Sequence, residues 1–76
     1  MQTLAELKIG QKALILDLNN DNIPLKLLEM GCLPGNTIEI LQVAPMGDPL
    51  YINVNGSFVA IRKETALEVS VEILNP

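Results

Sequence analysis

The side chains that most often catalyse reactions or bind metals are scarce in this sequence. It contains no histidine, so the usual acid and base of neutral pH and the commonest metal ligand are both missing. Cys32, Ser57 and Ser70 therefore have no imidazole to activate them, which excludes a nucleophilic triad. No two candidate ligands show a recognisable metal spacing, and there is no P-loop motif. We expect no catalytic residue, no metal site and no cofactor, and we expect that the protein is not an enzyme.

One segment begins like a calcium-binding loop. Asp17, Asn19 and Asp21 place side-chain oxygens at its first, third and fifth positions. The sixth position should be glycine and is Asn22, and the twelfth should be glutamate and is Leu28. Because both demanding positions fail, we interpret the segment as a solvated turn.

The composition indicates one small domain that works in the cytosol. The chain has 76 residues, 49% of them hydrophobic and 18% charged, and we expect a single domain over residues 1–76. One cysteine allows no internal disulfide, which suits a reducing compartment. No apolar run approaches the roughly 20 residues that span a bilayer, and the N-terminus does not have the plan of a signal peptide. We therefore expect a cytoplasmic protein without membrane insertion.

The charge balance argues against nucleic acid as a partner. Nine acidic residues outnumber five basic ones, for a net charge of −4, and Arg62-Lys63 is the only adjacent basic pair. Tyr51 and Phe58 are the only aromatic residues, too few for a surface on which bases stack. We expect no nucleic-acid binding.

The spacing of apolar residues predicts about five short strands and one helix. The strands are expected over residues 13–18, 37–44, 50–54, 57–61 and 69–73. Thr3 and Glu6 have the spacing of a capping box, which predicts one helical turn, and a second turn is expected over residues 63–67. A small, partly open barrel is the economical way to bury such strands without long exposed edges.

The helix is expected over residues 23–30. Asp21 or Asn22 would cap its N-terminus, Pro24 would lie in its first turn, and Gly31 would end it. The side chains expected to face the core are those of Leu25 and Leu28, with Leu27 as a further candidate.

Asn55-Gly56 predicts a two-residue type I′ hairpin turn. It sets a register with the opposing pairs Val54–Ser57, Ile52–Val59 and Leu50–Ile61. These residues would face the core, apart from Ser57, and Tyr51 and Phe58 would share the other face. In the last strand, Val69, Val71 and Ile73 are expected to face inward and Glu68, Ser70 and Glu72 outward.

Two further segments, residues 30–35 and 44–49, combine turn residues with exposed apolar ones. The glycines and prolines that we expect to shape these turns are Gly31, Pro34, Gly35, Pro45, Gly47 and Pro49. Leu33 and Met46 would lie at turn tips, where an apolar side chain gains nothing unless something covers it. The cover is either the protein's own helix or a partner.

Three blocks resemble the FeoA family over about residues 4–73. They are Leu27-Leu28-Glu29-Met30-Gly31-Cys32-Leu33-Pro34-Gly35, Val43-Ala44-Pro45-Met46-Gly47-Asp48-Pro49 and Val59-Ala60-Ile61-Arg62-Lys63-Glu64. The resemblance implies a small cytosolic SH3-like barrel associated with FeoB, a ferrous-iron permease with a cytosolic GTPase domain. It also implies an accessory role in ferrous iron uptake. The same module forms the C-terminal domain of some iron-dependent repressors.

On this basis we expect a binding module that docks on the cytosolic side of the permease. The expected contact residues are Leu27, Leu33, Met46, Asp48 and Arg62, with Leu33 and Met46 as apolar anchors. The alternative is an SH3-like regulatory module that binds a transcription regulator or self-assembles weakly. Its surface would be the face with Tyr51 and Phe58.

Overall fold

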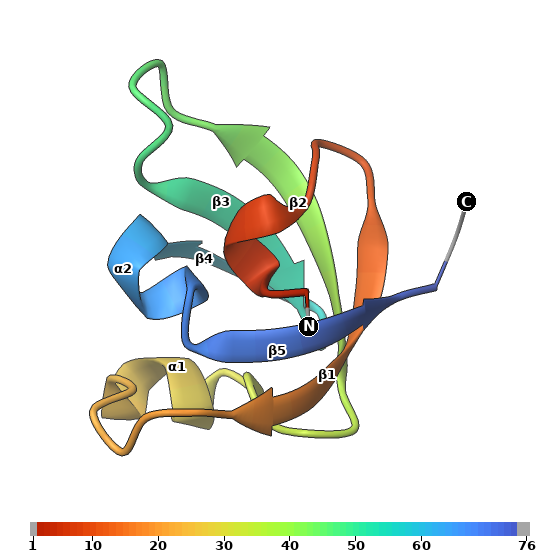
Figure 1. Cartoon of the computed structure of the whole chain (residues 1–76), viewed down its shortest axis with the longest axis vertical. Helices are drawn as coiled ribbons and strands as arrows, with labels where there is room; N and C mark the ends of the chain where they lie inside the picture. The colour runs from red at the N-terminus through yellow and green to blue at the C-terminus, as the bar shows by residue number, and fades with distance from the viewer. Residues whose placement is uncertain (1, 75–76) are drawn as a thin grey trace.

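The computed structural model describes residues 2–74, which form a five-stranded antiparallel sheet and short helical segments (Figure 1). The elements are η1 (Leu4–Glu6, a 3-10 turn), β1 (Lys12–Leu18), α1 (Leu25–Glu29), β2 (Thr37–Val43), β3 (Leu50–Val54), β4 (Ser57–Ile61), α2 (Lys63–Ala66) and β5 (Val69–Ile73). The strands lie in the order β4-β3-β2-β1-β5, so β4 and β5 are the two edges. The expected mainly β architecture is confirmed.

The β3–β4 hairpin has the register that its turn predicts. Asn55 and Gly56 both adopt positive φ, +52° and +87°, as a type I′ turn requires. The observed pairs include Leu50–Ile61, Ile52–Val59 and Val54–Ser57. The side chains of this inner face are buried, except that Ser57 and Val59 are half-buried. The hydrophobic pattern and the turn together therefore determine which face of the hairpin covers the core.

The N-terminal turn closes the core from one side. The carboxylate of Glu6 accepts a hydrogen bond from the backbone N–H of Thr3 at 2.8 Å, which is one half of the expected capping box. Leu4 follows this cap and is fully buried against the sheet. The cap thus orients the side chain of Leu4 into the hydrophobic core.

The helix α1 begins later than expected. Its N-cap is Pro24, so the prediction that Asp21 or Asn22 would cap it is wrong. A residue before proline avoids the helical conformation, which keeps Ile23 out of the helix. Instead, the side chain of Asn20 accepts a hydrogen bond from the Asn22 N–H at 2.7 Å, which forms a local turn.

The burial along α1 also differs from the prediction. Leu25 is 68% exposed, so its assignment to the core is wrong, while Leu27 is buried and Leu28 is half-buried. Gly31 ends the helix as expected. Its N–H donates to the Leu28 carbonyl at 3.1 Å, and the Cys32 N–H donates to the Leu27 carbonyl at 2.9 Å, which together form a Schellman motif.

Gly31 also allows the end of α1 to approach the β3–β4 turn. It has a φ of +103°, and a Cβ at this position would lie 2.9 Å from the Cβ of Asn55. The Asn36 side chain donates a hydrogen bond to the Gly31 carbonyl at 2.7 Å. The connection from α1 to β2 is therefore held against the hairpin.

Strand β5 departs from strict alternation at Ser70. This residue is 1% exposed, so the prediction that it faces solvent is wrong. Thr3 forms a bridge with it, and the Asn19 side-chain amide donates a hydrogen bond to its hydroxyl at 2.6 Å. The N-terminal segment thus pairs with the outer edge of β5 at this point, where the Val71 N–H donates to the Gln2 carbonyl at 3.0 Å. Asn19 satisfies the buried hydroxyl of Ser70.

Candidate functional site

An apolar groove lies between α1 and the edge strand β4. Its volume is about 490 Å³. Pro24, Lys26, Leu27 and Met30 line it from α1, residues 58–61 line it from β4, and Arg62 and Thr65 lie beside them. Figure 1 shows α1 and α2 on the same side of the molecule, with β4 behind α2. It is larger than three other hollows lined by described residues, whose volumes are about 220, 310 and 370 Å³.

The groove runs along the edge of β4 rather than across one face of the sheet. Successive side chains of a strand point to opposite faces. Phe58 and Ala60 share one face and Val59 and Ile61 the other, yet all four line the groove. Only a hollow that follows the strand edge contacts both sets, so the main chain of β4 borders it as well.

The charges at the groove are of one sign. Lys26 of α1 and Arg62 after β4 both line it, and no aspartate or glutamate does. Neither cation has an ion-pair partner within the described range 2–74. The chain has five basic residues and a net charge of −4. Two of these five residues thus line the same apolar groove.

A second hollow of about 370 Å³ adjoins this groove through shared residues. Asp48 and Pro49 line it together with Ala60 and Arg62. The carboxylate of Asp48 is already engaged, because it accepts a hydrogen bond from the Lys63 N–H at 2.9 Å. Asp48 therefore positions the loop against α2, and Arg62 is the charged side chain common to both hollows.

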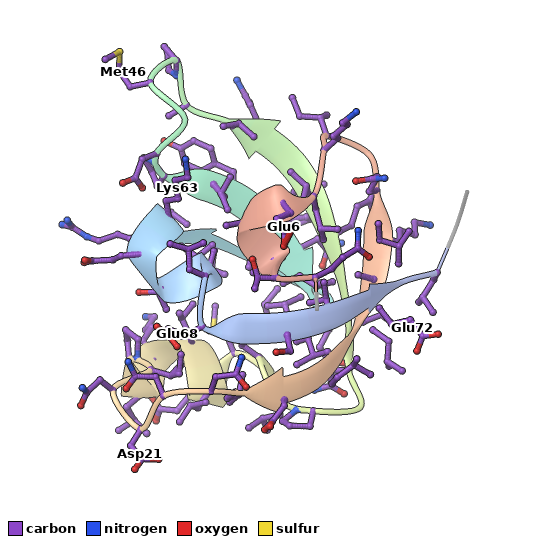
Figure 2. All side chains as sticks on the ribbon, in the orientation of Figure 1. Glu6, Asp21, Met46, Lys63, Glu68 and Glu72 are labelled. Carbon is purple, nitrogen blue, oxygen red and sulfur yellow. The ribbon has the colours of Figure 1, made fainter. Side chains whose placement is uncertain are left out.

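The predicted contact residues do not form one surface. Leu33 precedes β2 and Met46 follows it, so their turns lie at opposite ends of a seven-residue strand that is roughly 20 Å long. Figure 1 shows these connections at the lower and upper ends of β2, and Figure 2 shows Met46 pointing into solvent. Met46 is 92% exposed and Leu33 is 42% exposed, so the protein's own helix covers neither completely.

Of the remaining predicted residues, Leu27 and Arg62 line the groove and Asp48 lies next to it. Leu27 is only 5% exposed, so it forms part of the floor rather than a projecting anchor. Sequence reasoning assigned Phe58 to the alternative surface and did not name Met30 or Ala60 as contact residues. For Phe58 and Ala60 the sequence signal was the exposed face of the hairpin, and this face does not reveal that α1 lies alongside.

No metal-binding cluster is found among residues 2–74, since no three acidic or cysteine side chains gather in this range. Cys32 is fully buried, and burial raises the pKa of its thiol above the ordinary value. No helix within the same range is long and apolar enough to cross a membrane.

Comparisons with known proteins cover nearly the whole chain. The family model described as FeoA domain matches residues 2–73. A curated relative from Porphyromonas gingivalis, the Fe(2+) transport protein A/Fe(2+) transporter FeoB fusion protein, is 36% identical over 73 residues. The match covers 95% of this chain and 9% of that protein, so the chain spans about a tenth of the relative's length.

Two solved structures have a similar fold. The solution structure of FeoA from Chlorobium tepidum has a TM-score of 0.89 and 31% identity, and covers 97% of this chain and 71% of that one. The crystal structure of Stenotrophomonas maltophilia FeoA complexed with zinc, described as an SH3 domain protein, has a TM-score of 0.73 and 31% identity. That match covers 95% of this chain and 91% of the other. The fold is therefore SH3-like, as the resemblance implied.

Proposed function

Because the chain belongs to the FeoA domain family, we propose that it is a cytoplasmic accessory protein of ferrous iron uptake. It acts by binding the cytosolic part of a FeoB-type permease, not by catalysing a reaction. The observation that carries the proposal is the apolar groove between α1 and β4, with Lys26 and Arg62 beside it.

The fusion protein of Porphyromonas gingivalis supports this choice of partner. In that relative, the counterpart of this chain and the transporter are parts of one polypeptide. A covalent link raises the effective concentration of one domain for the other, which benefits domains that bind each other weakly. Association of this kind requires a docking surface on the domain itself.

The exposure of the groove residues suits docking. Phe58 is 72% exposed, and such a large aromatic side chain gains contact area only when a partner covers it. The neighbouring floor of Leu27 and Met30 belongs to the rigid end of α1, which the Schellman motif at Gly31 holds in place. Because such apolar side chains are already held in place, little conformational entropy is lost when a partner binds them.

The test is an amide NMR titration of the labelled protein with the soluble cytosolic domain of a FeoB-type permease. Phe58→Asp should weaken binding by about tenfold or more, because it places a charge in the apolar contact. Ile9→Asp is the matched control, since Ile9 is 62% exposed and lies before β1, outside the residues that line the groove. It should change the affinity less than about twofold.

Equal affinity for the Phe58→Asp and native proteins would overturn the groove as the docking surface. Leu33→Ser and Met46→Ser then show whether either end of β2 carries the contact instead. No binding by the native protein, with either the isolated domain or the intact permease, would overturn the proposed partner.

Self-association through Tyr51 and Phe58 stays an alternative, because both side chains are exposed on the same strand pair. Sedimentation over a concentration series tests it. A monomer at the highest concentration would contradict it.

A further inference from the structure

We propose that the groove receives an extended acidic segment of a protein partner, and that this segment joins the sheet as an additional strand beside β4. The inference deepens the proposed function and rests on it for the identity of the partner. The main chain, the lining and the charges of this edge define the segment.

The main chain of β4 offers hydrogen-bonding groups to the groove. In a hairpin with a two-residue turn, the residues flanking the turn form a hydrogen-bonded pair, and bonded and non-bonded pairs then alternate. Ser57, Val59 and Ile61 are thus bonded to β3, while the N–H and C=O groups of Phe58 and Ala60 point away from it. Within residues 2–74, no backbone hydrogen bond to Phe58 or Ala60 is present from this outer side.

These unpaired groups border the groove between α1 and β4. All of residues 58–61 line it, and α1 contributes its opposite wall with Leu27 and Met30. An extended segment could therefore pair with Phe58 and Ala60 while its side chains contact apolar walls. This is the arrangement of β-strand addition, in which main-chain bonds give affinity and side-chain pockets give specificity.

The charges select the composition of the segment. Lys26 and Arg62 border the groove from different elements, and neither has an ion-pair partner among residues 2–74. None of the nine acidic residues of the chain lines the groove, so the groove attracts an acidic segment more than the acidic surfaces do. The segment we propose has β-forming apolar residues with aspartate or glutamate near both ends.

The main-chain contact is tested with Ala60→Pro. Proline removes the N–H that points to the groove, and it does not remove a bond to β3, so the hairpin is retained. Ala60→Thr is the matched control, because it keeps the N–H and favours a strand. The probe is a synthetic ten-residue peptide of alternating valine and threonine flanked by glutamates, and a second peptide carries lysine in place of glutamate.

The glutamate peptide should slow amide exchange at Phe58 and Ala60 and should bind at least about fivefold more tightly than the lysine peptide. Ala60→Pro should weaken its binding by about tenfold or more, and Ala60→Thr by less than about threefold. Joint replacement of Lys26 and Arg62 by glutamate should reverse the peptide preference. Lys8→Glu combined with Lys63→Glu adds the same charge outside the groove lining and should leave the preference unchanged.

The outcomes separate this inference from the proposed function. If the permease domain binds but exchange at Phe58 and Ala60 is unchanged and Ala60→Pro binds normally, strand addition is wrong and the proposed function stands. If the glutamate peptide pairs with β4 and the permease does not bind in any form, the partner is wrong and strand addition stands. Ala60→Pro abolishing self-association, with no effect on either peptide, would identify a second copy as the occupant and overturn the acidic segment.

Discussion

The carboxylate of Asp48 accepts a hydrogen bond from the backbone N–H of Lys63 at 2.9 Å. Lys63 is the first residue of α2, and the residue before it, Arg62, has no side chain that can cap a helix. The cap therefore comes from the β2–β3 loop, 15 residues earlier in the chain. In Figure 2, Lys63 lies beneath this loop, whose tip carries Met46.

This cap should contribute measurably to stability. Asp48→Ala leaves the Lys63 N–H without its partner, and we expect the free energy of unfolding to fall by about 1 kcal/mol. Asp48→Asn keeps an acceptor oxygen at the same place and should lose less than half of that. Urea unfolding followed by circular dichroism measures both. Equal losses for the two variants would show that the charge, rather than the hydrogen bond, is what matters.

The close approach of Gly31 to Asn55 should make Gly31→Ala costly. The new Cβ would lie 2.9 Å from the Asn55 Cβ at a φ of +103°, and we expect a loss of about 2 kcal/mol or more. Gly47→Ala is the control, because Gly47 has a φ of +84° but no atom within 4 Å of the added Cβ. The free energy of unfolding of Gly47→Ala should fall by only about 1 kcal/mol.

The same contact allows a rescue. Asn55→Gly removes the opposing Cβ and suits the φ of +52° at that position. The double variant Gly31→Ala with Asn55→Gly should therefore be less destabilised than the sum of the two single variants. Strict additivity in thermal or urea unfolding would contradict the proposed clash.

The buried hydroxyl of Ser70 should be coupled to Asn19. Ser70→Ala removes the acceptor of a 2.6 Å hydrogen bond in a position that is 1% exposed, and we expect a loss of about 1 kcal/mol. Asn19→Ala should lose a similar amount, and the double variant little more than either. A double-mutant cycle by chemical unfolding measures this coupling, and a coupling free energy near zero would show that the bond does not stabilise the fold.

The buried thiol of Cys32 should make stability fall at alkaline pH. Burial raises the pKa of this thiol above its ordinary value of 9.0, so above pH 9 the unfolded chain loses the proton more readily than the folded protein. The unfolded state then binds fewer protons, and the free energy of unfolding decreases as the pH rises. Near neutral pH this thiol is protonated in both states and contributes no pH dependence.

Cys32→Ala isolates that effect from the other groups that titrate at high pH. The difference in unfolding free energy between the native protein and this variant should shrink as the pH rises above 9. A constant difference up to pH 10.5 would contradict the prediction. The thiol should also react far more slowly with iodoacetamide in the folded protein than in urea, because the side chain is fully buried.

The docking surface shows how far sequence reasoning reached. Leu27 and Arg62 were both named as contacts, and both line the groove. Leu33 and Met46 were combined into one patch because each has an apolar side chain on a turn. The length of β2 separates them, and nothing in the spacing of two turn motifs reveals the direction in which each turn points.

The sequence by itself determined the features that depend on a few neighbouring residues. Asn55-Gly56 sets the hairpin register, and Gly31 ends α1, because a positive φ is accessible to few residues and is decided locally. The alternation of apolar and polar residues then indicated which side chains of most strands face the core. A shift of the pairing register by one residue would expose every apolar side chain of a strand.

Only the tertiary structure decided the features that join distant segments. Asp48 caps α2, the N-terminal segment pairs with β5 at the buried Ser70, and the edge of β4 faces α1 across an apolar groove. Each of these depends on which elements become neighbours when the sheet closes. Which elements become neighbours is set by the burial of the whole hydrophobic core, and a local pattern in the sequence does not reveal it.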